Sequence, residues 1–397
     1  MKIIVHDYAG HPFQADLSRE LARRGYAVEH VYFSGDQGPK GNLECQENDP
    51  VSLSFRPISI EMPYSKSNFF VRRKGDLAYG RKIAAVIRES RPDIVISGNS
   101  PTEIQEYVLG ACKDAGARFY YWIQDFYSIA VAKLLAKKLP VLGLPISLYY
   151  KFLERRQLAL ADGVISITES FGNQLSKWKI GQDKVHVIPN WGAISEIPRL
   201  AQEDSTWGSD NQLDERDIIL YSGTLGMKHN PHMLVTLARE MPNVQVVVAA
   251  SGVGVDALKH AKQEGSVENL ILFPLQDFNI FPQMLAAASV FVAFIESDAG
   301  EFSVPSKVLS YLCAGRPVVL AAPEENLAAK IVEDNCAGLT VDAGDVAGFV
   351  RAVNEVVNDK DMLMKMSDAA RSYAEANFHI FDIASRFERV FGTSRVS

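Results

Sequence analysis

The chain has 397 residues, of which 47% are hydrophobic and 22% charged, and its formal net charge is −7. This length predicts two domains, the composition is that of a folded globular protein, and the negative charge excludes a general nucleic-acid binder. The four cysteines show no C-x-x-C spacing, so we expect reduced thiols and no metal site. Neither a signal peptide nor a run of 18 apolar residues is present, which makes the cytoplasm the expected location.

Short apolar runs alternate with helical patterns along the first half of the chain. The runs that we interpret as strands cover residues 2–6, 29–33, 93–97, 118–123, 163–168 and 185–188. Helical periodicity covers residues 12–24, which Gly25 ends, and residues 73–90, which Arg91 and Pro92 end. This alternation predicts a parallel sheet with helices on both faces.

The second half repeats the alternation. Its expected strands cover residues 218–222, 244–250, 270–273, 290–295, 317–321 and 338–341, and its expected helices cover 231–240, 255–263, 282–288, 306–312, 325–333 and 346–358. Residues 194–216 are polar and predict a linker. We therefore expect two Rossmann-like domains, 1–193 and 194–379, that face each other across a cleft, with a last helix at 380–397 on the first domain. Ligands of such sheets bind beyond the carboxyl ends of the strands.

A glycine-rich turn follows the expected strand at 218–222. Its candidate donor-binding residues are Gly223, Thr224 and Gly226. Glycines let backbone N–H groups approach a phosphate, and Lys228 adds a positive charge. The next helix is expected to have Asn230 as its N-cap and Pro231 at its first position. An ordinary strand-to-helix turn is the alternative interpretation.

A second candidate anion site lies where a helix is expected to start, near Pro305 or Ser306. The first-turn amides and the dipole of a helix attract an anion. Lys307 stands where a cation is unfavourable, and a bound diphosphate would remove that conflict. The alternative is that Lys307 points into water. The donor-binding candidates around this helix start are Glu301, Ser303, Pro305, Ser306 and Ser310.

Gly252 and Gly254 follow the expected strand at 244–250 in a weak match to the dinucleotide pattern G-x-G-x-x-A. We interpret them as a close backbone approach to a nucleotide sugar. An oxidoreductase that binds NAD is the alternative.

The strand expected at 118–123 is followed by Gln124 and Asp125. Both side chains are candidates for sugar contacts, although Asp125 serves equally well as the cap of the next helix. Residues 131–156 are apolar with flanking basic residues, a pattern that suits a peripheral contact with a membrane or a buried helix pair.

Six segments together resemble a known family. They are 12–25 (Pro-Phe-x-x-x-Leu-Ser-Arg-Glu-Leu-Ala-Arg-Arg-Gly), 122–125 (Trp-Ile-Gln-Asp), 161–165 (Ala-Asp-Gly-Val-Ile), 187–191 (Val-Ile-Pro-Asn-Trp), 222–226 (Ser-Gly-Thr-Leu-Gly) and 304–307 (Val-Pro-Ser-Lys). In order and spacing the sequence resembles the retaining glycosyltransferases of family 4, which have the GT-B fold. Within that family it is similar to bacterial enzymes of colanic-acid, O-antigen and exopolysaccharide biosynthesis.

This resemblance implies transfer of a sugar, with retention, from a nucleoside-diphosphate sugar held mainly by the second domain. Lys228 and Lys307 match the diphosphate-binding positions, and Asp125 is the third candidate catalytic residue. The loop that contains Gly10 and His11 would face donor sugar and acceptor, together with Gln124. The resemblance further implies metal-independent catalysis without a cofactor, and a lipid-linked glycan acceptor at the inner face of the membrane.

The chain departs from the family pattern at four places. The first of two family glutamates falls on Phe302, with Glu301 one residue away, and Asp125 lies near a position where other members have histidine. Ser310 stands where many members have a glutamate that contacts the ribose, and Thr224 stands where many have arginine. These departures leave open a nucleotide-sugar-binding protein without transferase activity. An epimerase that acts on a nucleotide sugar is a further alternative.

Overall fold

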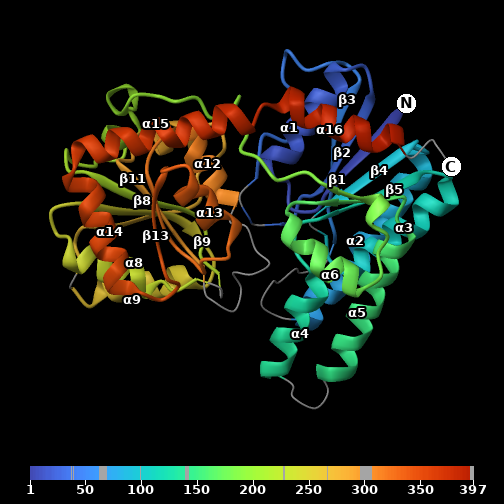
Figure 1. Ribbon diagram of the computed structural model, residues 1–397, viewed down its shortest axis with the longest axis horizontal. Helices are drawn as coiled ribbons and strands as arrows, with labels where there is room; N and C mark the ends of the chain where they lie inside the picture. The colour runs from blue at the N-terminus through green and yellow to red at the C-terminus, as the bar shows by residue number, and fades with distance from the viewer. Residues whose placement is uncertain are drawn as a thin grey trace. The chain divides into compact units, whose positions relative to one another are not determined.

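The computed structural model describes residues 1–36, 38, 40–61, 69–98, 100–138, 143–226, 229–265, 267–295 and 306–393. The chain divides into two compact units. The first comprises Met1–Gln37, Gly41–Asn190 and Ile380–Ser397, and the second comprises Gly38–Lys40 and Trp191–His379 (Figure 1).

The first unit is built on a seven-stranded parallel sheet with the order β3-β2-β1-β4-β5-β6-β7. Its strands are β1 (Lys2–Asp7), β2 (Ala27–Phe33), β3 (Leu53–Ile58), β4 (Ile94–Gly98), β5 (Arg118–Ile123), β6 (Gly163–Ser166) and β7 (Val185–Val187). The central strands β1, β4 and β5 are buried almost throughout, because helices cover both faces of the sheet. This burial explains why the strands read as short apolar runs.

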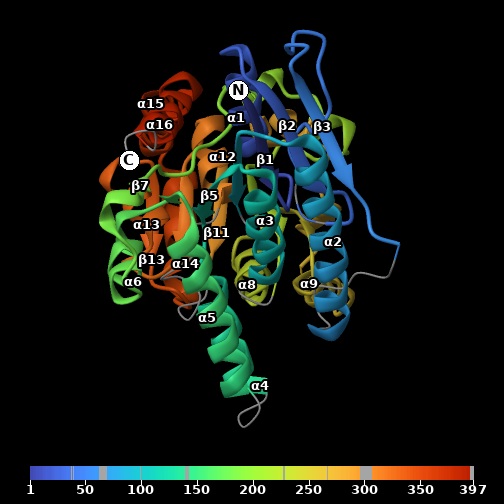
Figure 2. The ribbon, with the colours of Figure 1, turned by 90° about the vertical axis from the view of Figure 1, so that its right-hand side faces the viewer.

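Helices lie on both faces of this sheet (Figure 2). They are α1 (Pro12–Arg23), α2 (Phe69–Ser90), α3 (Thr102–Ala115), α4 (Tyr127–Lys138), α5 (Gly143–Leu160), α6 (Gly172–Lys177) and α16 (Ile380–Thr393), with short 3-10 turns at Glu169–Phe171 and Gln182–Lys184. The strand order reverses at β1, so right-handed crossovers place α1 on one face and α3 and α5 on the other. The last helix, α16, packs on α1, where Arg24 bonds Glu388 and lies over the Phe381 ring.

The strand β3 was not expected from the sequence. Only Leu53 and Ile58 at its ends are buried, while Ser54 is exposed and Arg56 and Pro57 interrupt the apolar pattern. A proline is tolerated here because β3 is an edge strand with β2 as its single neighbour. The tertiary position, rather than the local sequence, makes this segment a strand.

The second unit contains a six-stranded parallel sheet with the order β10-β9-β8-β11-β12-β13. Its strands are β8 (Ile218–Thr224), β9 (Gln245–Ser251), β10 (Leu270–Phe273), β11 (Val290–Phe294), β12 (Val318–Ala321) and β13 (Gly338–Val341). Its helices are α7 (Trp207–Asp210), α8 (His232–Glu240), α9 (Gly254–Gln263), α10 (Phe281–Ala286), α12 (Ser306–Ala314), α13 (Leu327–Asp334), α14 (Val346–Asn358) and α15 (Lys360–Asn377), with a 3-10 turn at Gln202–Asp204. Thus the second unit is also doubly wound.

Two local expectations in this unit are wrong. The segment expected as a linker at 194–216 packs on the second unit: Ile197 and Trp207 are buried, and the Trp207 ring lies edge-on to Phe273. Helix α8 starts at His232, so Pro231 is its N-cap rather than its first residue. Asn230 still serves the helix start, because its side chain accepts a hydrogen bond of 3.0 Å from the His232 N–H.

Helices α4 and α5 lie side by side and extend beyond the rest of the first unit (Figures 1 and 2). Val131, Leu135 and Tyr150 form a small core between them, so the segment is a helix pair that is buried only in part. One face of α5 nevertheless remains apolar and exposed. No helix in the described part of the chain is long and apolar enough to cross a bilayer.

Candidate active site

The carboxyl end of β8 carries the glycine-rich turn of the second unit. Gly223 has φ +112°, a conformation that side-chain-bearing residues rarely adopt. The Tyr221 hydroxyl donates a hydrogen bond of 2.9 Å to the Thr224 carbonyl, and the Leu225 N–H donates one of 2.7 Å to the Ser251 carbonyl. The Gly226 N–H donates to Nδ1 of His229 over 3.0 Å. These bonds hold the turn in one conformation up to Gly226.

Lys307 lies beside this turn, on the first turn of α12. Its Nζ is buried and has no hydrogen-bond partner among the described residues. The ammonium stands 3.7 Å from the centroid of the Tyr221 ring. Burial lowers the pKa of Lys307 from 10.5 to about 7, because the charged form loses its hydration. The alternative that Lys307 points into water is therefore wrong, and within the described part of the chain this buried cation has no counter-charge.

Gly252 and Gly254 have an internal packing role. A Cβ on Gly252 would lie 2.7 Å from the Leu225 carbonyl oxygen, and a Cβ on Gly254 would lie 2.6 Å from Leu225 Cγ. The Gly254 N–H donates to the same carbonyl over 2.9 Å. Both glycines thus let the turn after β9 support the turn after β8, a requirement that holds with or without a dinucleotide.

Four of the predicted site residues lie outside the described residues: Lys228, Glu301, Ser303 and Pro305. Ser306 begins α12 and is exposed, and Ser310 lies one turn further along and is partly exposed. In the second unit the structure therefore brings together Gly223, Thr224, Gly226 and Lys307, at the carboxyl end of β8 and the start of α12.

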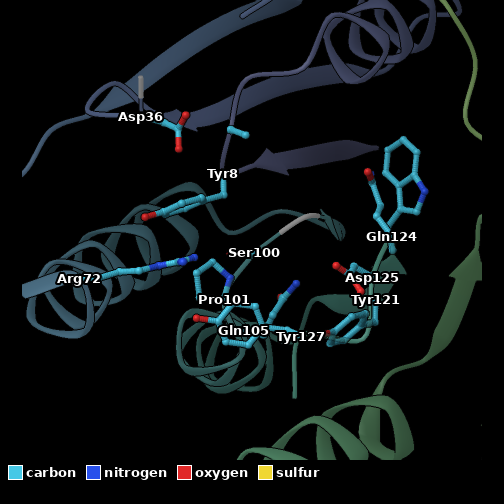
Figure 3. A pocket seen from close by; sticks show the side chains of 12 residues that line it. Tyr8, Asp36, Arg72, Ser100, Pro101, Gln105, Tyr121, Gln124, Asp125 and Tyr127 are labelled. Atoms are coloured by element: carbon cyan, nitrogen blue, oxygen red, sulfur yellow. The ribbon is translucent and has the colours of Figure 1, made fainter. Parts of the chain in front are cut away.

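The first unit has a cavity of about 310 Å³ at the carboxyl ends of β1, β4 and β5. It is lined by Tyr8, Ala9, Asp36, Arg72, Ser100, Pro101, Gln105, Tyr121, Trp122, Gln124, Asp125 and Tyr127 (Figure 3). Figure 3 shows Tyr8 and Arg72 on one side of the cavity, and Gln124 and Asp125 on the other. This volume and this mixture of aromatic and polar side chains are typical of a small-molecule site.

Among the polar atoms of the cavity lining, Ser100 Oγ, Gln105 Oε1 and Gln124 Nε2 are buried and lack hydrogen-bond partners in the described part of the chain. The other amide atom of each glutamine is hydrogen-bonded. Gln105 donates from Nε2 to the Ser97 carbonyl over 3.3 Å, and Gln124 Oε1 accepts from the Asn190 side chain over 3.4 Å. Buried polar atoms without partners are costly, so these atoms are suited to a ligand with hydroxyl groups.

A charged wall borders the cavity on the side of α2. The Tyr8 hydroxyl donates a hydrogen bond of 2.8 Å to Asp76, whose other oxygen lies 3.6 Å from Nε of Arg72. Burial raises the pKa of Asp76 to about 6, and the Arg72 charge opposes part of that rise. Arg72 also lies over the Tyr127 ring, at 5.7 Å from its centroid.

The predicted residues Gly10 and His11 do not line this cavity. Asp7 at the end of β1 is buried, accepts a bond from the His11 N–H, and lies 3.2 Å from Nδ1 of that ring. Burial alone would raise the pKa of Asp7, but His11 lowers it below its usual value. Gly10 has φ +78° and accepts from the Gly41 N–H over 2.8 Å. The structure therefore ties Gly10 and His11 into the turn after β1.

Asp125 lines the cavity, while a different carboxylate caps α4. The N–H groups of Tyr127 and Ser128 donate to Glu154 of α5 over 3.0 and 3.2 Å, and the Ser128 hydroxyl donates over 2.6 Å. Glu154 is fully buried, and burial raises its pKa to about 7. This long-range cap also ties α4 to α5.

The cavity includes residues that the sequence analysis missed. Tyr8 and Ser100 follow β1 and β4, so the rule that ligands bind beyond the carboxyl ends of strands could have identified them. Arg72 and Gln105 come from the first turns of α2 and α3, where no motif distinguishes them.

Comparison with solved structures identifies the class of fold. Sucrose-phosphate synthase (tll1590) from Thermosynechococcus elongatus matches with a TM-score of 0.76 and 15% identity, over 99% of this chain and 98% of that one. Anabaena Alr3699/HepE matches with a TM-score of 0.72 and 17% identity, over 99% of this chain and 100% of that one. The two doubly wound units thus form the GT-B fold of glycosyltransferases.

The family follows from two models that match successive parts of the chain. Glycosyltransferase Family 4 matches residues 13–191, and Glycosyl transferases group 1 matches residues 205–373. The chain belongs to the family 4 glycosyltransferases. Among curated proteins it is similar to the putative colanic acid biosynthesis glycosyl transferase WcaI of Escherichia coli (strain K12), with 27% identity over 283 residues, 69% of this chain and 68% of that protein.

Proposed function

We propose that this glycosyltransferase moves a sugar from a nucleoside-diphosphate sugar to a lipid-linked glycan, with retention of configuration, in bacterial surface polysaccharide biosynthesis. The buried ammonium of Lys307 carries the proposal, because it has no counter-charge among the described residues and stands at a helix start. A diphosphate would supply the missing negative charge, and the α12 amides would bind its oxygens.

The donor would be held by the second unit. Lys228 and the turn with Gly223, Thr224 and Gly226 would contact the diphosphate beside Lys307. HepE has been crystallised with UDP-glucose, which makes a UDP-sugar the first donor to test. The short Ser310 side chain leaves the ribose to other contacts, and Glu301, Ser303, Pro305 and Ser306 remain candidates for them.

The acceptor would be bound by the first unit. The unpartnered atoms of Ser100, Gln105 and Gln124 suit the hydroxyl groups of a sugar, which both donate and accept. We place Asp125 at the reacting sugar because it lines the same cavity. The turn with Gly10 and His11 would shape the entrance to this cavity, as the family resemblance implies.

The leaving diphosphate would be stabilised by protein groups. Its negative charge grows as the bond to the sugar breaks, and fixed cations and helix amides that point at this charge lower the barrier. We therefore propose metal-independent transfer without a cofactor, with Lys307 and Lys228 as the cations. Retention is the course that the similarity to retaining family 4 enzymes implies.

The donor is tested by thermal unfolding with UDP, GDP, ADP, their sugars and NAD, with EDTA and with Mg²⁺. A ligand at 100 times its Kd adds about 2.7 kcal/mol to the free energy of unfolding, which shifts the melting temperature visibly. We expect one nucleoside diphosphate and its sugar to stabilise the protein equally with EDTA and with Mg²⁺. Stabilisation by NAD alone would contradict the proposal, and a shift without turnover would favour a binding protein that lacks transferase activity.

We also propose a peripheral contact with the inner face of the membrane through residues 131–156. Leu144, Leu148 and Phe152 lie four residues apart on one face of α5 and are 65%, 58% and 66% exposed. Lys151 and Arg155 are exposed on the same helix. A helix with an apolar face and basic flanks binds an anionic lipid surface.

The double variant Leu148→Ser, Phe152→Ser is expected to lower binding to phosphatidylglycerol vesicles about 100-fold or more, because burial of each side chain contributes about 1.5–3 kcal/mol. Vesicle co-sedimentation measures this loss. Met364→Ser in the second unit is the matched control, since Met364 is 58% exposed but lies on α15. Equal binding by the α5 variant and the control would exclude the proposed contact.

A further inference from the structure

Tyr221 places an aromatic ring directly under the Lys307 ammonium. The Nζ lies 3.7 Å from the ring centroid, and the ring itself is fully buried. The Phe294 ring stacks with it at 5.1 Å between centroids, with 25° between the planes. Because the Tyr221 ring is buried and stacked on Phe294, it is held against the lysine.

Gly223 also lies against the end of the Lys307 side chain. A Cβ at this position would lie 3.3 Å from Lys307 Cε and 3.5 Å from Nζ. The absence of a side chain therefore makes room for the end of the lysine, two residues along β8 from the ring. Strand β8 therefore contacts Lys307 through the Tyr221 ring and through the backbone of Gly223.

Tyr221 also connects the lysine to the turn that precedes α8. Its hydroxyl donates to the Thr224 carbonyl over 2.9 Å. The next residue of β8 is bonded to α12: the Ser222 N–H donates a hydrogen bond of 2.8 Å to the Tyr311 hydroxyl. The ring, the turn and the first turns of α12 are thus held as one unit.

The negative face of an aromatic ring attracts a cation, and this attraction reaches about 2 kcal/mol when water is excluded. Burial is the cause of the lowered pKa of Lys307, and no described charged side chain offsets it. The Tyr221 ring, 3.7 Å from Nζ, therefore gives the ammonium a favourable electrostatic contact.

We infer that Tyr221 is a positioning residue, whose ring holds the Lys307 ammonium in place for the departing diphosphate. The inference rests on the proposed function, in which Lys307 binds that group. A lysine held in advance loses little conformational entropy when the transition state forms. Loss of the ring should therefore lower kcat more than it changes KM.

The test uses the nucleotide sugar that stabilises the wild-type protein most, with release of the nucleoside diphosphate as the readout. Tyr221→Leu is expected to lower kcat about tenfold with KM changed less than threefold, and Tyr221→Phe, which keeps the ring, to retain most of kcat. In the Lys307→Met background, Tyr221→Leu should have no further effect, because a residue that acts through Lys307 couples fully to it.

An equal loss of kcat from Tyr221→Leu with and without Lys307 would overturn the inference, as would full activity of Tyr221→Leu. Thermal unfolding shows whether Tyr221→Leu folds. If it does not, Phe294→Leu, which loosens the same pair of stacked rings, is measured in its place, alone and together with Lys307→Met. Failure of the proposed function gives a different result, in which wild-type protein binds no nucleotide sugar and Lys307→Met changes nothing.

Discussion

Replacement of Lys307 by alanine is expected to lower turnover of the nucleotide sugar about 100-fold or more, because a preorganised group that stabilises developing charge contributes about that factor. The buried Nζ has no partner among the described residues, so the side chain does not hold the fold together through a hydrogen bond. Removal of a buried unpaired charge stabilises a protein or leaves its stability unchanged.

A loss of turnover without a loss of stability would separate a catalytic role of Lys307 from a structural one. Steady-state rates and thermal unfolding are measured for Lys307→Ala and for Lys330→Ala, a matched control on α13 whose side chain is exposed. The control should retain its rate. Unchanged turnover in Lys307→Ala would remove its role at the leaving group, and a large drop in melting temperature would show that the lysine is structural.

Lys307 also shows what local sequence can predict. A cation in the first turn of a helix opposes the helix dipole, and this conflict identifies Lys307 as a candidate site residue from the sequence alone. Its contact with Tyr221 could not be predicted in this way, because the two residues are far apart in sequence and meet only when α12 packs beside β8. The burial that lowers the lysine pKa arises from the same packing.

The strands could be predicted where both faces of the sheet are covered, because such strands are continuous apolar runs. The edge strand β3 lacks that pattern and was missed. The cavity of the first unit could be predicted in part: Gln124 and Asp125 directly follow a strand, whereas Arg72 and Gln105 reach the cavity from the first turns of two helices. Helix side chains enter a site through packing geometry, which leaves no motif in the sequence.

Gly252 and Gly254 show the limit of a glycine pattern in the sequence. The pattern predicts a close approach of the backbone, and the structure gives Leu225 of the adjacent turn as one close neighbour, while the contact with a nucleotide sugar stays a prediction. A glycine reports crowding without identifying what crowds it. At Gly223 the close neighbour is the Lys307 side chain.

Affinity for the nucleoside diphosphate is expected to fall about tenfold between pH 7 and pH 8.5. Burial lowers the pKa of Lys307 to about 7 in the free protein, and a bound diphosphate raises it again by pairing with the ammonium. Binding above pH 7 must therefore take up a proton, and each pH unit well above 7 costs up to tenfold in affinity. The phosphates themselves titrate near pH 6, below this range.

The same pKa shift makes the free energy of unfolding rise with pH, whereas the affinity for the diphosphate falls. The pKa of Lys307 is lower in the folded chain than its ordinary value of 10.5, so burial of the ammonium costs stability in full below about pH 7, and this cost disappears as the pH rises from 7 toward 10.5. Isothermal titration with UDP, or with the nucleoside diphosphate that stabilises most, at pH 7 and 8.5 measures the affinity change. Lys307→Met should bind weakly and equally at both pH values. A tenfold fall that persists in Lys307→Met would assign the titration to another group, and a constant wild-type affinity would place the diphosphate away from Lys307.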